Sequence, residues 1–544
     1  MGLFTKVEDR PTPSNVYNWR VYAIAAVAGS AAIMIGYDSA FIGGTLALDS
    51  FRDEFGFENM SKEAVNLLSA NIVSCYQAGA FFGALGAYIA AYFMGRASGL
   101  ALFAGIFTVG AAMMLGCNGD RGLGLMYGGR VLAGIGVGGA SNLSPIYISE
   151  IAPPAIRGRL VCMFELGWQI GGLVGFWINY GINKTLPSNH SQWIIPFAVQ
   201  LVPSGMLFLG AFWLHESPRW LMTKGQREKA IRNLCWIRDL PQDDIYIQEE
   251  VYAIESNIER QMAAGGLGFW QPFKLLASSR KIQWRFFLGG SLFFWQNTSG
   301  INAINYYSPT IFKSIGITGT NTALFTTGLF GVVKTVFTLI YLVFLIDQYG
   351  RRRLLMIGAI GGSVCLWYVG GYIAVAKPAL HPTTSLPPSG ISAIFFFYLW
   401  TAFYSPTWNP TPWVYNSEMF DQNVRTLAQA FAAANNWFWN FLVARFTPQM
   451  FEAMDYGVYF FFASLMICSA IFVYFLLPET KNIPLEGIDR LFDRKLKATH
   501  AHAIVWRELQ NEEEALRVNI VGGGLEKRDG GSVEQVEIRD KGEV

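Results

Sequence analysis

The sequence predicts an all-α membrane protein with twelve transmembrane helices in two similar six-helix halves. Of its 544 residues, 52% are hydrophobic and only 15% are charged, which is typical of membrane proteins. The hydropathy divides into about twelve apolar stretches of the length that a helix needs to cross a bilayer. Charged motifs of the first half recur in the second at an offset of roughly 260 residues, which indicates an internal duplication.

The expected spans divide the chain into five parts. They cover about residues 21–48, 67–92, 98–117, 125–147, 162–182, 193–214, 286–311, 322–346, 354–376, 391–413, 427–446 and 457–477. The parts are a leader (1–20), a first half (21–214), a linker of short amphipathic helices (215–285), a second half (286–477) and a largely disordered tail (478–544). Lys and Arg gather in alternate loops and in the leader, linker and tail, so the positive-inside rule places both termini in the cytoplasm.

The first span carries an acid, Asp38, in the motif Gly36-Tyr37-Asp38. A charged and unpaired carboxylate inside a bilayer costs several kcal/mol, so we expect Asp38 to be paired or protonated part of the time. A wet position near the interface is the alternative. Arg130 opens the fourth span and also needs a partner, which makes it the best candidate to pair with Asp38. The glycines that follow, between residues 133 and 141, predict close helix packing rather than a dinucleotide site.

The seventh span contains the most informative stretch, from Phe294 to Tyr307. Its amides, Gln296, Asn297 and Asn302, do not tolerate hydrocarbon and must face a cavity. A helix break near Gly300 would help these amides converge, as broken helices do in transporters. Because amides both donate and accept hydrogen bonds, they suit a neutral polyhydroxylated ligand.

Charged motifs mark the ends of both halves that we assign to the cytoplasm. Glu150 and Arg157 recur with the same spacing as Glu418 and Arg425. The other charged residues of these motifs are Arg96 and Arg351, Glu216 and Glu479, and Arg219. We expect such groups to pair across the halves in one conformation and to separate in another, as a cytoplasmic gate.

In this order the motifs resemble those of the sugar porters of the major facilitator superfamily, and among these the fungal quinate permeases. The resemblance extends from Tyr17 to about Arg494 and includes the acid of the motif Asp347-x-x-Gly350-Arg351, which joins the gate. It implies a major facilitator fold, a central site built mainly by the second half, and proton symport.

The resemblance also assigns roles to individual residues of the site. Gln296, Asn297 and Asn302 would bind hydroxyl groups, and Asn436 would supply another amide. Trp408 and Trp413 would form an apolar wall, with packing or an interfacial position as the alternative. The prolines at 406, 410 and 412 make the tenth span a hinge candidate.

Two departures from the family pattern change the expected charge of the site. Glu165 stands where a ligand-binding glutamine is usual, and Lys334 stands where an asparagine is usual, although the spacing to Asp347 leaves that alignment ambiguous. For a cyclitol carboxylate such as quinate, Lys334 would offset the charge of the substrate. Glu165 would then be neutral or paired with Lys334. A structural lysine is the alternative.

These features predict a proton symporter that imports quinate by alternating access across the cell membrane. In it, a proton on Asp38 would loosen the hold of this acid on Arg130. A proton-coupled hexose, pentose or polyol porter is the alternative, and a non-transporting nutrient sensor is a third reading. We expect no enzyme activity, because no nucleophile and base stand in a recognisable arrangement. The six cysteines lack metal-ligand spacing, so we expect no metal or cofactor, and we expect no nucleic-acid partner.

Overall fold

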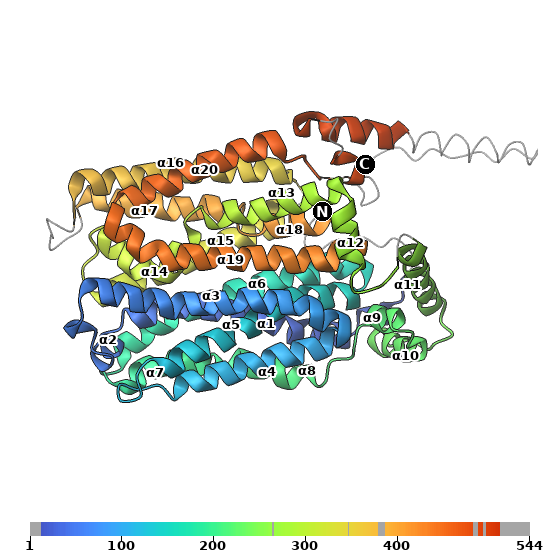
Figure 1. Ribbon diagram of the computed structural model, residues 1–544, viewed down its shortest axis with the longest axis horizontal. Helices are drawn as coiled ribbons and strands as arrows, with labels where there is room; N and C mark the ends of the chain where they lie inside the picture. Colours follow the sequence, from blue (N-terminus) through green and yellow to red (C-terminus); the bar gives the residue numbers. More distant parts are fainter. Residues whose placement is uncertain are drawn as a thin grey trace, which may run out of the picture.

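The computed structural model describes residues 12–263, 266–345, 348–378, 387–420, 422–481, 483, 488–492 and 497–511. These residues form helices and loops and contain no strand. Long helices lie side by side in an elongated bundle, with the first half of the chain on one side and the second half on the other (Figure 1). The predicted all-α fold is confirmed.

The first half begins with the 3-10 turn η1 (Ser14–Tyr17) and contains two short helices at one end of the bundle, α2 (Asp49–Glu54) and η2 (Phe57–Asn59). Its long helices are α1 (Trp19–Leu46), α3 (Lys62–Phe93), α4 (Arg96–Leu115), α5 (Gly124–Ile151), α6 (Pro154–Thr185) and the pair α7 (His190–Val199) and α8 (Leu201–Ala211).

The second half repeats this arrangement but breaks more of its spans. Its helices are α13 (Arg280–Asn297), α14 (Ile301–Ser314), α15 (Thr320–Ile340) with the π-helical turn η3 (Tyr341–Leu345), α16 (Arg351–Ala376), α17 (Pro388–Tyr404), α18 (Thr411–Met419), α19 (Gln422–Met454) and α20 (Gly457–Leu476).

Nine helical segments of the described residues are long and apolar enough to cross a membrane. The other three expected spans coincide with α13–α14, α17–α18 and α19. Two of these are broken into shorter helices, and α19 carries several amides. The segments that fall short of a simple apolar helix are therefore the ones that the polar site needs.

Glycines in α5 allow its neighbours to approach at backbone distance. A Cβ on Gly134 would lie 2.0 Å from the carbonyl oxygen of Tyr76, and a Cβ on Gly138 would lie 2.0 Å from that of Ala80. Both carbonyls belong to α3. No side chain larger than hydrogen fits there, which confirms that these glycines serve helix packing.

The largest contacts between the two halves join α3 with α19, α6 with α15, and α1 with α14. The linker helices lie beyond one end of the bundle (Figure 1) and are α9 (Pro218–Thr223), α10 (Arg227–Arg238), α11 (Ile245–Ala263) and α12 (Gln271–Ser278). Arg238 binds Glu250 at 2.6 Å and donates to the Ile151 carbonyl at 2.7 Å, which fastens the linker to the end of α5. We call this the linker end.

Part of the tail (478–544), which was expected to be largely disordered, is helical. After the short helix α21 (Ile488–Leu491), residues 498–511 form a helix whose Ala501 and Val505 are fully buried. These two residues are one helical turn apart, so they present one apolar face to the bundle. Asp489 also forms an ion pair with the buried Arg285 of α13. The rest of the tail, from residue 512, lies outside the described residues.

Candidate functional site

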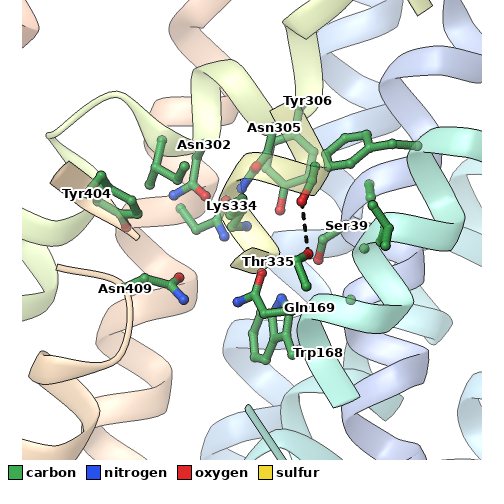
Figure 2. Close-up of a pocket in the computed structure, with 18 of the residues that line it drawn as sticks. Ser39, Trp168, Gln169, Asn302, Asn305, Tyr306, Lys334, Thr335, Tyr404 and Asn409 are labelled. Carbon is green, nitrogen blue, oxygen red and sulfur yellow. Dashed lines mark hydrogen bonds between the residues drawn. The ribbon is translucent and has the colours of Figure 1, made fainter. Parts of the chain in front are cut away.

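A polar cavity lies between the two halves, midway along the bundle. The first half contributes Ser39 from α1 and Trp168 and Gln169 from α6. The second half contributes most of the amides and the single lysine (Figure 2). Its polar lining residues are Gln296, Asn297, Asn302, Asn305, Tyr306, Lys334, Thr335, Tyr404, Asn409, Asn436 and Asn440. Such a lining of convergent polar groups suits a small polar molecule.

The predicted break in the seventh span is confirmed. Helix α13 ends at Asn297 and α14 begins at Ile301, with Gly300 between them at φ +93°. A Cβ at Gly300 would also lie 2.9 Å from the Phe462 ring. Both the left-handed backbone and the close ring require glycine here. The break turns the amides of both helix ends toward the cavity.

These amides hold one another in fixed orientations. The Gln296 amide donates to the carbonyls of Trp408 at 2.8 Å and Asn409 at 2.9 Å. Asn297 donates to Asn436 at 3.1 Å and accepts from Asn302. The Gln296 oxygen has no partner among the described residues, although it is buried. A buried acceptor without a donor is costly, so this oxygen is available for a ligand hydroxyl.

The tenth span is broken where its prolines predict a hinge, between Tyr404 of α17 and Thr411 of α18. The two tryptophans of this segment differ in position. Trp413 lines the cavity and packs against Phe293, with their ring centroids 4.7 Å apart. Trp408 does not line the cavity: its side chain is buried and donates to the Leu355 carbonyl at 2.9 Å. The expected wall role of Trp408 is therefore wrong, and its packing alternative is correct.

Glu165 and Lys334 lie on opposite halves, and of the two only Lys334 lines the cavity. One carboxylate oxygen of Glu165 accepts from Gln169 and from Asn409, each at 2.8 Å. The bond to Asn409 joins α6 of the first half to the broken tenth span. Lys334 lines the cavity, is only 8% exposed and lies close enough to Glu165 for their charges to interact. Among the described residues no carboxylate lies within 4.0 Å of its amine.

Asp38 and Arg130 form an ion pair in which both side chains are fully buried. Arg130 also donates to the Ile72 carbonyl at 3.1 Å, and its guanidinium lies 4.4 Å from the centre of the Tyr76 ring. The second oxygen of Asp38 has no partner among the described residues. The pair is as predicted, and it lies next to the cavity because the following residue, Ser39, lines it.

Trp437 connects this ion pair to the cavity. It belongs to α19 and lies next to Asn436, yet it packs on the first half: its ring centroid is 6.0 Å from that of Tyr76 and 6.5 Å from that of Trp168. Its indole nitrogen also faces the Ser141 hydroxyl at 3.4 Å. Arg130, which pairs with Asp38, therefore contacts Tyr76, and Tyr76 contacts Trp437 next to the cavity amide Asn436.

Several lining residues were missed by sequence reasoning. Gln169 and Asn440 each lie one helical turn after a residue that was identified, Glu165 and Asn436 respectively. That spacing is a usable signal, because side chains four apart share a helix face. Asn409 follows Trp408 in a non-helical segment, where no periodicity reveals its direction.

The gate residues form matching clusters within each half. Arg96 binds Glu150 at 2.9 Å, and the Glu216 carboxylate accepts from the Arg96 backbone at 2.7 Å. In the second half Arg351 binds Glu418 at 2.8 Å, and Glu479 accepts from the Arg351 backbone at 2.9 Å. The duplication is thus repeated in atomic detail, but these bonds do not cross the halves as expected.

A cavity at the linker end explains this difference. It separates Arg96, Glu150 and Arg219 of the first half and linker from Arg425 of α19. Arg425 donates to the Phe420 carbonyl at 3.4 Å, and Arg157 is exposed at the start of α6. Charged groups of both halves therefore line this cavity in this conformation. Asp347 lies outside the described residues.

A duplicated helical bundle with broken helices around a central polar cavity defines a membrane transporter of the major facilitator superfamily. The chain belongs to the sugar transporter family, because the family described as "Sugar (and other) transporter" matches residues 22–492.

Comparisons with curated proteins and solved structures agree with this assignment. The chain is 64% identical to the quinate permease of Emericella nidulans over 525 residues, 96% of this chain and 98% of that protein. It is 63% identical to the probable quinate permease of Neosartorya fischeri over 536 residues, 98% and 99% of the two chains. The solved structure of the proton:xylose symporter XylE is similar with a TM-score of 0.70 and 28% identity, covering 87% of this chain and 99% of that one.

Proposed function

We propose that this transporter imports quinate with protons by alternating access across the cell membrane, with both termini in the cytoplasm. The names of its relatives favour quinate as the substrate class, and the similarity to the proton:xylose symporter XylE favours proton symport. One observation carries the proposal: the Lys334 amine lines a cavity of amides, and no described carboxylate lies within 4.0 Å of it. A cyclic polyhydroxy carboxylate has the complementary groups.

In this proposal the carboxylate of quinate binds Lys334, and its hydroxyls bind the surrounding amides. The free Gln296 oxygen accepts from one hydroxyl, and Asn302 and Gln169 supply further groups. Glu165 interacts with Lys334 by charge and is held by Gln169 and Asn409. Two bare carboxylates in a pocket of low dielectric repel strongly, so Glu165 is protonated or paired with Lys334 while substrate is bound.

The proton acts on the ion pair of Asp38 and Arg130. A neutral Asp38 no longer holds the guanidinium by charge, so Arg130 is free to shift against Tyr76. Because Trp437 packs on Tyr76 and follows Asn436, this shift reaches the substrate amides of the other half. The two halves then rock about the central cavity, and the charge clusters of Arg96 and Arg351 rearrange at the linker end.

Uptake of labelled quinate in a transport-null cell tests the proposal. We expect accumulation above the external concentration, stimulation by low external pH and loss of accumulation with a protonophore. Uptake that only equilibrates quinate, or that ignores both treatments, would contradict proton symport.

A neutral hexose, pentose or polyol porter is the second candidate, and the proximity of Glu165 to Lys334 favours it. If those two charges neutralise each other, the remaining amides suit a sugar. Competition by quinate, shikimate, glucose and inositol separates the candidates: the acids compete best in the first, and the neutral compounds in the second. A nutrient sensor has no need of a buried Asp38–Arg130 pair, which speaks against that reading.

A further inference from the structure

A third cavity lies between the halves at the end of the bundle opposite the linker helices. It is bounded by residues 43–69 of the first half and by residues 306–314 and 447–455 of the second, and we call it the outer vestibule. Tyr306 lines both the vestibule and the central cavity. A Cβ on Gly43 of α1 would lie 2.2 Å from the Tyr306 carbonyl oxygen, so the contact of α1 with α14 forms the wall between the two cavities.

Three cationic side chains line the outer vestibule. Arg52 on α2 and Lys62 on α3 come from the first half, and Lys313 on α14 comes from the second. Arg52 and Lys313 lie close enough for their charges to act on each other. No carboxylate of the described residues lies within 4.0 Å of any of the three. Like charges therefore face each other across the junction of the halves.

The acids of the vestibule do not neutralise these cations by direct pairing. Glu452 and Asp455 line it at the end of α19, and Glu452 accepts from Asn66 at 3.1 Å. The charge of Asp49 attracts Lys313, but the two groups are more than 4.0 Å apart and form no ion pair. The three cations outnumber the two lining acids, and no described carboxylate lies within 4.0 Å of them. The bond from Asn66 orients Glu452 but leaves its charge in place.

A concave surface with unpaired cations concentrates anions and raises their rate of capture. An arginine fork and an ammonium group both bind carboxylates through charge-assisted hydrogen bonds. An anion between Arg52 and Lys313 also offsets their mutual repulsion, which otherwise opposes the approach of α2 to α14.

We propose that the outer vestibule is an anion-capture site, which binds the carboxylate of the substrate before the α1–α14 wall opens toward the central cavity. The inference rests on the proposed function, because it takes the substrate to be a carboxylate that enters from this end. It adds a binding site, at Arg52, Lys62 and Lys313, that a transporter of neutral sugars does not need.

Thiol labelling measures the charge of the vestibule without relying on transport. A Thr310→Cys variant places a thiol on its wall, because Thr310 lines the cavity and is exposed. The labelling rates with a negative and a positive impermeant methanethiosulfonate reagent are compared, with the parent chain as background. We expect Arg52→Gln and Lys313→Gln each to lower the ratio of negative to positive labelling by roughly three- to tenfold. Lys184→Gln, an exposed cation at the same end outside the vestibule, should leave it unchanged.

Quinate provides the second part of the test. It should slow labelling of the Thr310→Cys thiol, and Arg52→Gln should remove this protection. In uptake assays Arg52→Gln and Lys313→Gln should raise the KM for quinate several-fold at low ionic strength, with Vmax retained and the effect reduced by salt.

An unchanged labelling ratio, absence of protection by quinate, or an unchanged KM despite a changed ratio would each overturn the capture site. Protection of the Thr310→Cys thiol by quinate, without accumulation of quinate by the wild-type protein, would contradict the proposed function and leave the anion site standing.

Discussion

Replacing Lys334 with asparagine tests the charge match between cavity and substrate. This change removes the only cation that lines the central cavity within the described residues and replaces it with a neutral amide. Lys334 is 8% exposed, so little solvent screens its charge. At about 4 Å and an effective dielectric constant of about 20, two opposite charges attract by about 4 kcal/mol.

The net effect is smaller because the substrate loses hydration when it binds. A hydrogen bond to a charged group contributes about 1.5–3 kcal/mol after that cost. Since about 1.4 kcal/mol corresponds to a factor of ten, we expect Lys334→Asn to raise the KM for quinate roughly 10- to 150-fold. Competition by a neutral polyol should weaken much less.

Initial rates of labelled quinate uptake over a range of concentrations measure this change, with surface expression determined for each variant. Lys334→Arg is the matched control, because it keeps the charge while changing the shape. We expect it to retain more affinity than Lys334→Asn. An unchanged affinity for quinate in Lys334→Asn would refute the reasoning and favour a structural lysine.

Three further variants test other parts of the site. Gly300→Ala should lower the free energy of unfolding by about 1–2 kcal/mol and should also slow transport, because the new side chain strains a left-handed backbone and meets Phe462. A melting curve in detergent measures the loss of stability. Asn409→Ala removes the bond between Glu165 and the tenth span, so we expect a changed transport rate with a smaller change in KM, measured by uptake kinetics. Trp408→Phe should keep the KM, but it should lose about 1 kcal/mol of stability because it removes the hydrogen bond to the Leu355 carbonyl. Trp413→Ala should raise the KM, because Trp413 lines the cavity.

The outcomes that would contradict these expectations differ for each variant. Full stability of Gly300→Ala would mean that the break tolerates a side chain. Uptake by Asn409→Ala with wild-type rate and KM would show that the bond to Glu165 has no role in transport. A larger rise in KM for Trp408→Phe than for Trp413→Ala would place Trp408 in the wall after all.

The position of the break at Gly300 was predictable, because a run of amides inside an apolar span has few physical solutions. The pair of Asp38 and Arg130 was predictable for a similar reason: each needs a partner, and few buried charges are available. Both inferences rest on the cost of placing polar groups in hydrocarbon. That cost depends on which residue types lie within an apolar span, and the sequence alone shows this.

The direction of side chains in non-helical segments was not predictable. Trp408 and Asn409 are neighbours in a proline-rich break, and only the folded backbone shows that the amide faces the cavity and the indole faces α16. The pairing of Arg96 with Glu150 inside one half depends on the conformation of the protein, which the duplication alone does not reveal. The helix at 498–511 was missed because its many polar residues conceal an apolar face at Ala501 and Val505.

Proton movement in purified vesicles tests the central claim most directly. The wild-type protein is reconstituted, quinate is added outside, and internal pH is recorded together with labelled quinate. We predict that quinate influx acidifies the interior in the wild type, and that Asp38→Asn carries quinate downhill without moving protons. Proton movement with quinate in Asp38→Asn that equals that of the wild type would contradict the coupling role of the Asp38–Arg130 pair.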